Sequence, residues 1–215
     1  MMKESSFLRK LEEKTVNAED LSKEAIRSKD RLQELLNGIS SSKSRVKFQS
    51  AKVLRIVSEK HPELLYPNWM FFRKLLDSEN SILKWNALDI IANLTAVDSD
   101  DNFERLFTKF YGYMDEGSLI TAGHVIDSSG KIARVKPKLQ GAITKKLLLV
   151  EKLSVPTAEC RNILIGKAIG ALGSYQDKMK DRREVVSFVK RQLSNPRRST
   201  QIKAQKLLEK MKELP

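Results

Sequence analysis

The chain has 215 residues, which fits one compact domain or one short repeat array, and its single cysteine excludes an intrachain disulfide. It lacks the run of about 18 apolar residues that a membrane-spanning helix needs. Its first residues also lack the apolar core of an export signal, so we expect a cytoplasmic protein. Few prolines and glycines and little alternation of apolar and polar residues favour an all-α fold.

The net charge of +13 is concentrated in the C-terminal part of the chain. Residues 131–215 carry 21 Lys and Arg against 7 Asp and Glu, whereas residues 1–130 carry 19 against 20. This asymmetry indicates either a surface for a polyanionic partner or a lysine-rich solvated surface. Composition leaves both interpretations open.

The N-terminal part is predicted to hold a short helix followed by a long one. Residues 1–16 are expected to form a short helix or a frayed cap. Asn17 is an expected N-cap, with Asp20 three residues later in a weak capping-box arrangement. Apolar residues at helical spacing then predict one continuous helix that ends near Gly38.

A fifteen-residue stretch then occurs five times, at residues 44–58, 80–94, 116–130, 161–175 and 197–211. Apolar positions spaced by three and four residues predict that each copy is an amphipathic helix. In register, the copies share a column of small residues at spacings of 36, 36, 45 and 36. These residues are Ala51, Ala87, Gly123, Ala168 and Ala204. A small residue in mid-helix lets another helix cross closely, and a period of this size indicates a solenoid.

Each copy is expected to be the second helix of a helical hairpin. The hairpins are predicted at about residues 17–62, 67–95, 101–133, 137–175 and 180–214. The last one has a lysine-dominated surface, as the terminal repeat of an array requires. The predicted fold is therefore an all-α, right-handed α-solenoid of about five hairpins, in a repeat domain that spans residues 17–215.

The turn DSEN at residues 77–80, followed by the apolar, alanine-centred helix of residues 80–94, resembles HEAT repeats. The resemblance covers roughly residues 20–214, and ECRNILIGKAI at residues 159–169 is similar to uncharacterised prokaryotic HEAT-like proteins. It implies a scaffold that grips a partner, usually a protein, in a groove lined by the second helices. Some HEAT-like proteins bind nucleic acid, and one subgroup consists of alkylpurine DNA glycosylases.

Two constellations were weighed as catalytic sites. His124, Asp127 and Ser128 lie within one helical turn. A nucleophile, its base and the orienting acid usually come from separate elements, so a polar groove wall is the favoured interpretation. Trp85 and Asp89 offer the aromatic ring and the carboxylate that a base-excising enzyme uses. A core tryptophan beside a solvated aspartate is favoured there, and we expect no enzymatic activity.

No metal or cofactor site is predicted, because two histidines and one cysteine lie far apart in the sequence. Cys160 opens a predicted helix whose N-terminus would stabilise a thiolate, but a small half-buried residue is the favoured interpretation. Gly166, Gly170 and Gly173 lie inside an apolar helix and are expected to seat neighbouring helices, not a phosphate.

The basic residues of the last two hairpins are the candidate binding residues. They are Arg161, Lys167, Arg182, Arg183, Arg197, Arg198, Lys203 and Lys206. Clustering of Lys and Arg on adjacent helices is typical of phosphate binding. Few aromatic residues accompany them, so stacking on single strands is not indicated.

The sequence thus predicts a non-catalytic binding scaffold with a macromolecular partner, most often a protein. Nucleic-acid binding through the basic C-terminal hairpins is the alternative, and a DNA glycosylase is a distant third. No membrane partner is expected, and the oligomeric state is left open.

Overall fold

The computed structural model describes residues 6–13, 15, 17–179 and 182–212 of the chain. Within these residues the structure is helical throughout its regular elements and contains no β-strand, so the all-α prediction is confirmed. The chain divides into two compact units, Met1–Asp98 (unit 1) and Ser99–Pro215 (unit 2).

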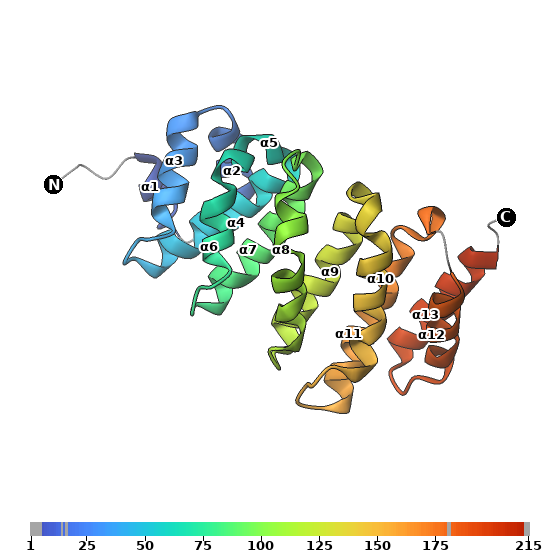
Figure 1. Ribbon diagram of the computed structural model, residues 1–215. Helices are drawn as coiled ribbons and strands as arrows, with labels where there is room; N and C mark the ends of the chain where they lie inside the picture. The colour runs from blue at the N-terminus through green and yellow to red at the C-terminus, as the bar shows by residue number, and fades with distance from the viewer. Residues whose placement is uncertain (1–5, 14, 16, 180–181, 213–215) are drawn as a thin grey trace. The chain divides into compact units, whose positions relative to one another are not determined.

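Unit 1 holds the helices α1 to α7, shown from blue to green in Figure 1. Their bounds are α1 Ser6–Lys10, α2 Ala18–Ile26, α3 Lys29–Gly38, α4 Ser44–Lys60, α5 Pro62–Leu65, α6 Trp69–Leu75 and α7 Ser81–Leu94. The long helix α4 is central, because α2, α3 and α7 all pack against it. Between α4 and α7, the buried Asn93 Nδ2 donates a hydrogen bond of 2.9 Å to Ser58 Oγ.

The prediction of one continuous helix from Asn17 to Gly38 is wrong, because the segment is divided into α2 and α3. Asn17 is the N-cap as expected, and its Oδ1 accepts a hydrogen bond of 2.9 Å from the backbone N–H of Glu19. The second helix begins after Ser28, whose Oγ accepts from the backbone N–H of Arg31. Serine is a strong N-cap residue, so the sequence did contain a signal for this second start.

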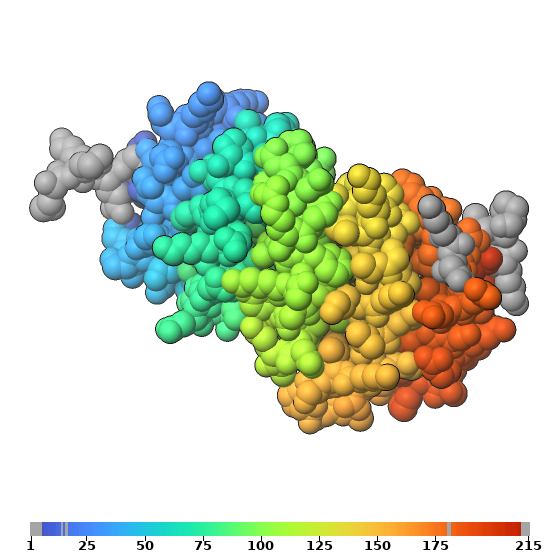
Figure 2. Space-filling model, viewed as in Figure 1, coloured from blue at the N-terminus to red at the C-terminus, as the bar shows by residue number. Residues whose placement is uncertain are grey.

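Unit 2 holds the helices α8 to α13. Their bounds are α8 Asn102–Gly112, α9 Leu119–Val135, α10 Gln140–Leu148, α11 Ala158–Gly173, α12 Arg183–Arg191 and α13 Arg198–Lys212. The long helices α9, α11 and α13 pack against one another in that order, and we call them the inner helices. The outer helices α10 and α12 pack on them and on each other. Figure 2 shows α10, in yellow, beside α12, in orange-red.

The inner helices α9 and α11 are parallel and approach each other at glycines. A Cβ added at Gly123 would lie 3.4 Å from Lys167 Cε, and one at Gly130 would lie 3.2 Å from the carbonyl oxygen of Ala171. Later residues of α9 therefore face later residues of α11. The second contact is with backbone, so the two helices are too close there for a side chain between them.

The helices α11 and α13 meet in the same way. A Cβ at Gly166 would lie only 2.7 Å from Oγ1 of Thr200. That hydroxyl is held in place, because it donates a hydrogen bond of 2.9 Å to the carbonyl oxygen of Asn162. Gly166 is therefore a close-packing position, as predicted. Gly170 is not: among the described residues, no heavy atom of a neighbouring element lies within 4 Å of a Cβ built there.

Exposure along the inner helices of unit 2 corrects the predicted register there. The half-buried or exposed residues His124, Lys167 and Lys203 share one place in the pattern. In this register Ala168 and Ala204 share a buried column with Val125, and Gly123 falls two residues earlier. All five residues of the predicted small column are buried.

Two buried tyrosines anchor the interior of unit 2. The Tyr111 hydroxyl donates to Ser129 Oγ at 3.1 Å, and the Tyr175 hydroxyl lies 2.9 Å from Thr144 Oγ1. Burial raises the pKa of the Tyr175 hydroxyl to about 12, and burial also raises the pKa of Tyr111 above its ordinary value. Burial therefore favours the neutral form of both hydroxyls.

Gly166→Ala and Gly170→Ala form a matched pair on α11. Alanine favours the helix by about 1 kcal/mol over glycine, so Gly170→Ala should raise the free energy of unfolding by up to that amount. Gly166→Ala should lower it by about 1–2 kcal/mol, because the new methyl group displaces Thr200 and its hydrogen bond. Urea unfolding of both variants measures the difference. Equal effects of the two substitutions would contradict the tight crossing at Gly166.

Alkaline unfolding tests the buried hydroxyl of Tyr175. Its pKa is raised in the folded protein, so folding favours the neutral form and this stabilisation is lost as pH rises above the ordinary value of 10. Between about pH 10 and 12 the free energy of unfolding should fall by about 2–3 kcal/mol more in the wild type than in Tyr175→Phe. The variant should start about 1 kcal/mol less stable, since its bond to Thr144 is lost. If the free energies of unfolding of the wild type and Tyr175→Phe fall in parallel over this pH range, Tyr175 is not buried as described.

Candidate functional site

The structure does not bring the predicted basic residues into one cluster. Lys167 and Lys203 line a hollow formed by the inner helices, whereas Arg183 lines a different hollow beside the outer helix α12. Arg182 is the N-cap residue of α12, and Arg198 is the first residue of α13. The expected footprint of eight basic residues is therefore distributed over different surfaces of unit 2.

Arg161 and Arg197 each contact another segment of unit 2. Arg161 is half-buried, and its Nη2 donates to the carbonyl oxygen of Leu153 at 3.4 Å. Within the part of the chain that the structure describes, the Nε of Arg161 is buried without a hydrogen-bond partner. Arg197 forms an ion pair with Glu159, which ties the start of α13 to the first turn of α11.

The other candidates on α12 and α13 are exposed. Arg183 borders a shallow hollow of about 500 Å³ together with Phe188 and Arg191. Arg198 Nη1 donates to Gln201 Oε1 at 3.0 Å on its own helix. Lys203 and Lys206 lie one turn apart on the exposed side of α13.

The inner helices together form one continuous exposed surface, which we call the inner-helix face. At its centre is a hollow of about 230 Å³ that all three helices line. The lining residues are Asp127, Gly130, Lys131, Arg134, Lys167, Gly170, Ala171, Ser174 and Lys203. Side chains from separate repeats therefore meet at one place, which no single helix could provide.

The floor of this hollow is open at Gly170. The residue is exposed and lies one turn after Lys167 on α11. Because its position carries no side chain and no neighbouring element fills the space, the backbone of α11 is accessible there. A ligand chain can therefore approach the helix more closely at Gly170 than at a position with a side chain.

Lys167 and Asp127 form an ion pair across the inner-helix face. The side chain of Lys167 is 35% exposed and that of Asp127 is 54% exposed. The aliphatic part of Lys167 lies along Gly123 of α9, where a side chain would compete for the same space. The ammonium group is therefore held at the surface of the hollow, beneath a carboxylate from the neighbouring helix.

Lys131 and Arg134 were missed in the sequence analysis. Both line the central hollow and are exposed on the last turns of α9. The signal was present, because they continue the exposed stripe of His124 and Asp127 at helical spacing. Both residues precede the last two predicted hairpins, which contain all the basic residues predicted to bind a partner.

One edge of the inner-helix face is apolar. Ile120 is 50% exposed in the first turn of α9, and Ile163 is half-exposed in the first half of α11. Each lies four residues before a polar residue of the exposed stripe, His124 and Lys167 respectively. On α9 and α11 the isoleucines therefore lie nearer the helix starts than the cations that line the hollow.

The weighed catalytic residues do not assemble into a catalytic arrangement. Ser128 is buried, while Asp127 faces Lys167 across the surface. Trp85 and Asp89 are both half-buried on α7 of unit 1. Among the described residues there is no group of three or more His, Cys, Asp or Glu that could hold a metal ion.

Cys160 is half-buried in the first turn of α11, in agreement with the favoured interpretation. Its backbone N–H donates to the N-cap hydroxyl of Thr157 at 3.1 Å.

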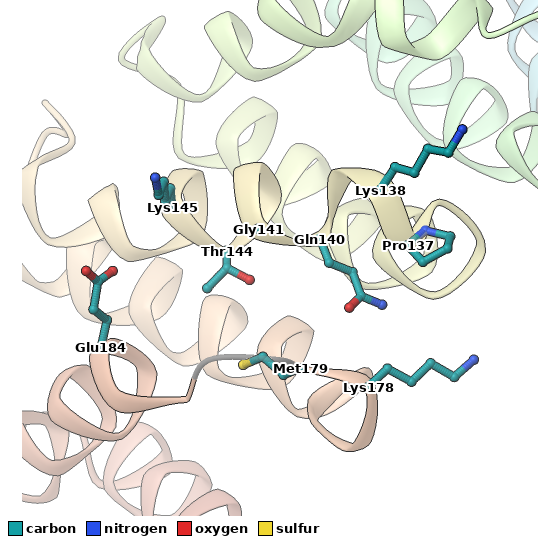
Figure 3. A pocket seen from close by; sticks show the side chains of 9 residues that line it. All are labelled: Pro137, Lys138, Gln140, Gly141, Thr144, Lys145, Lys178, Met179 and Glu184. Atoms are coloured by element: carbon teal, nitrogen blue, oxygen red, sulfur yellow. The ribbon is translucent and has the colours of Figure 1, made fainter.

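A larger hollow of about 710 Å³ lies beside the outer helices (Figure 3). Gln140 and Thr144 point from α10 toward the segment that carries Met179, whereas Lys138 and Lys145 point away from it. The two polar side chains are already engaged: Gln140 donates to the carbonyl oxygen of Ala133, and Thr144 is bonded to Tyr175. This hollow therefore offers few converging polar groups to a ligand.

No protein-family model matches the chain, and no curated protein matches it either. Solved structures do. The designed armadillo repeat protein YIII(Dq)4CqI has a TM-score of 0.58 and 15% identity, over 95% of this chain and 98% of that one. An engineered protein from the Northeast Structural Genomics Consortium has a TM-score of 0.57 and 15% identity, over 97% of each chain.

A third similar structure is the designed armadillo repeat protein YIII(Dq.V1)4CPAF in complex with peptide (KR)4. Its TM-score is 0.58 and its identity 14%, over 96% of this chain and 100% of that one. At such identity the likeness shows the fold alone. The chain is an all-helical repeat solenoid of the armadillo- and HEAT-like class.

The number of helices in a packed group differs along the chain. The helices α2, α3 and α4 form a packed triplet, whereas α10 and α11 form a pair. Within the described residues, no helix has both the length and the apolar character to span a membrane.

Proposed function

We propose that the protein is a non-catalytic binding module that holds a segment of a protein partner on the inner-helix face of unit 2. One observation carries this proposal: α9, α11 and α13 jointly line a hollow whose charged side chains are exposed. Repeat solenoids use extended surfaces of this kind for binding. The similar designed protein in complex with peptide (KR)4 supports a peptide as ligand.

The chemistry of the face supports a polypeptide partner. Isoleucines at one edge can bury apolar side chains, and lysines and Arg134 at the other can pair with charged ones. A polypeptide carries both kinds of group on one chain. The open backbone at Gly170 gives an extended chain room to lie across the helices.

The geometry around the weighed catalytic residues supports a module without catalysis. A nucleophile must be accessible and within hydrogen-bond reach of a base. Ser128 is buried, and Asp127 is engaged with Lys167 on the surface. On α9, Ser128 therefore packs in the interior, and Asp127 lines the inner-helix face.

Nucleic-acid binding is the second candidate, and the excess of basic residues after residue 130 favours it. Two observations favour the protein partner instead. Ile120 and Ile163 present apolar side chains on the inner-helix face, for which a phosphate backbone has no matching group. Few aromatic side chains accompany the cations, so bases lack stacking partners.

A bulky residue at Gly170 should block binding without disturbing the fold. Gly170→Trp fills the floor of the inner-helix face, and Gly141→Trp is its control on the outer helix α10. Both are helical glycines at which, in the described structure, a Cβ would meet no neighbouring element within 4 Å. Peptides selected from a random displayed library on the full wild-type chain should lose at least tenfold in affinity with Gly170→Trp, a loss of about 1.4 kcal/mol. Gly141→Trp should retain their affinity.

Selected peptides that depend on Gly141 and not on Gly170 would contradict this site. If no peptide is selected while duplex DNA or RNA binds in about 50 mM salt, the nucleic-acid candidate replaces the proposal. Melting temperatures of both tryptophan variants within a few degrees of the wild type establish that the comparison concerns folded protein.

A further inference from the structure

We propose that the partner segment is acidic, and that in the free protein Asp127 occupies the place on Lys167 that a carboxylate of the partner takes on binding. This inference rests on the proposed function and specifies the chemistry of the partner. It makes the Asp127–Lys167 ion pair an internal competitor of the ligand.

The charge of the inner-helix face calls for an anionic ligand. Its hollow is lined by four cations and one carboxylate: Lys131, Arg134, Lys167 and Lys203 against Asp127. Lys206 and Lys210 continue the exposed stripe of Lys203 at helical spacing along α13. Glu159 and Glu209 are also exposed on the inner helices, but neither lines the hollow. Charge complementarity therefore selects an acidic partner.

The side chain of Lys167 packs along α9. Its Cδ and Cε lie beside Gly123, where α9 has no side chain, and 35% of the Lys167 side chain is exposed. This packing limits the conformations of the lysine, so a carboxylate that replaces Asp127 loses less entropy in ordering it than at a fully exposed lysine.

The existing ion pair is replaceable. More than half of the Asp127 side chain and about a third of the Lys167 side chain are exposed. Ion pairs with such exposure contribute little to stability, because water and salt screen them. Replacing the Asp127 carboxylate by a carboxylate of the partner at Lys167 consequently costs the fold little. The other cations that line the hollow attract the partner's negative charge.

The apolar edge favours an acidic polypeptide over a nucleic acid. Ile120 and Ile163 flank the charged part of the face and can bury aliphatic side chains of the partner. A phosphate backbone has no apolar group for these positions. An acidic segment with interspersed Leu or Ile satisfies both edges.

Synthetic fluorescent peptides that alternate Glu with Leu test this inference on the full chain by anisotropy. Matched peptides replace Glu with Lys or with Gln. The Glu peptide should bind, and its affinity should fall steeply with salt. Asp127→Asn should tighten binding about three- to tenfold, and Lys167→Gln should weaken it by a similar factor. In the Lys167→Gln background the gain from Asp127→Asn should shrink, because the competed ammonium group is gone.

Glu184→Gln is the control, since it makes the same charge change on α12 beside the outer hollow. It should leave the affinity for the Glu peptide within twofold. If Glu184→Gln raises the affinity for the Glu peptide as much as Asp127→Asn does, the change in net charge explains the result and the role of Asp127 is wrong. No gain, or a loss, with Asp127→Asn would overturn it as well.

The outcomes separate this inference from the proposed function. If the Lys or Gln peptide binds better than the Glu peptide and is blocked by Gly170→Trp, the acidic partner is wrong while the peptide-binding face stands. If no peptide of any charge binds, both fall. If Asp127→Asn strengthens only the binding of duplex DNA or RNA, the face is a nucleic-acid surface and both fall again.

Discussion

The close approach of α9, α11 and α13 is the constraint on which the structure of unit 2 depends. Glycines at the crossings bring the helices within reach of each other's backbone, as at Gly130 against Ala171. Larger residues would push the helices apart and open the core. Because the helices are parallel and close, residues that are about forty positions apart in sequence become neighbours on one surface. The inner-helix face is a direct consequence of this packing.

The same repeat spacing also pairs charges between repeats. Ion pairs join successive repeats, as between Glu151 and Arg191 and between Glu159 and Arg197. Within unit 2 the buried Lys136 is paired with Glu104, 3.1 Å from its Nζ. The exposed cations of unit 2 lie both on the inner-helix face and beside the outer helix α12.

Much of the fold could be predicted from the sequence because local signals are strong. The spacing of apolar residues predicted the inner helices and the packing role of Gly166. The residue type at Asn17 predicted the N-cap of α2. The break before Ser28 was missed, because apolar residues at helical spacing continue across it. The register of the repeats in unit 2 was partly wrong, since it aligned Gly123 with Ala168 and Ala204. Loop lengths between repeats do not appear in a helical pattern, and they set the register.

The candidate site was predicted only in part. Lys167 and Lys203 were predicted as binding residues, and both line the hollow between the inner helices. The sequence gives no sign that a carbonyl engages Arg161 or that a distant carboxylate pairs with Arg197. Knowing that Asp127 faces Lys167 requires the relative register of α9 and α11, which depends on the intervening loop. The hollow could not be predicted from the sequence, because it depends on how α9, α11 and α13 are placed relative to one another.

The most direct measurement of the central claim is an isoleucine-methyl NMR titration of the full chain with the acidic peptide. Ile120 and Ile163 report on the inner-helix face, and the buried Ile143 of α10 reports on the outer side. We expect large shifts for the methyl groups of Ile120 and Ile163 and little change for Ile143. Shifts confined to Ile143, or to the isoleucines of α7 in unit 1, would place the binding site elsewhere and contradict the account.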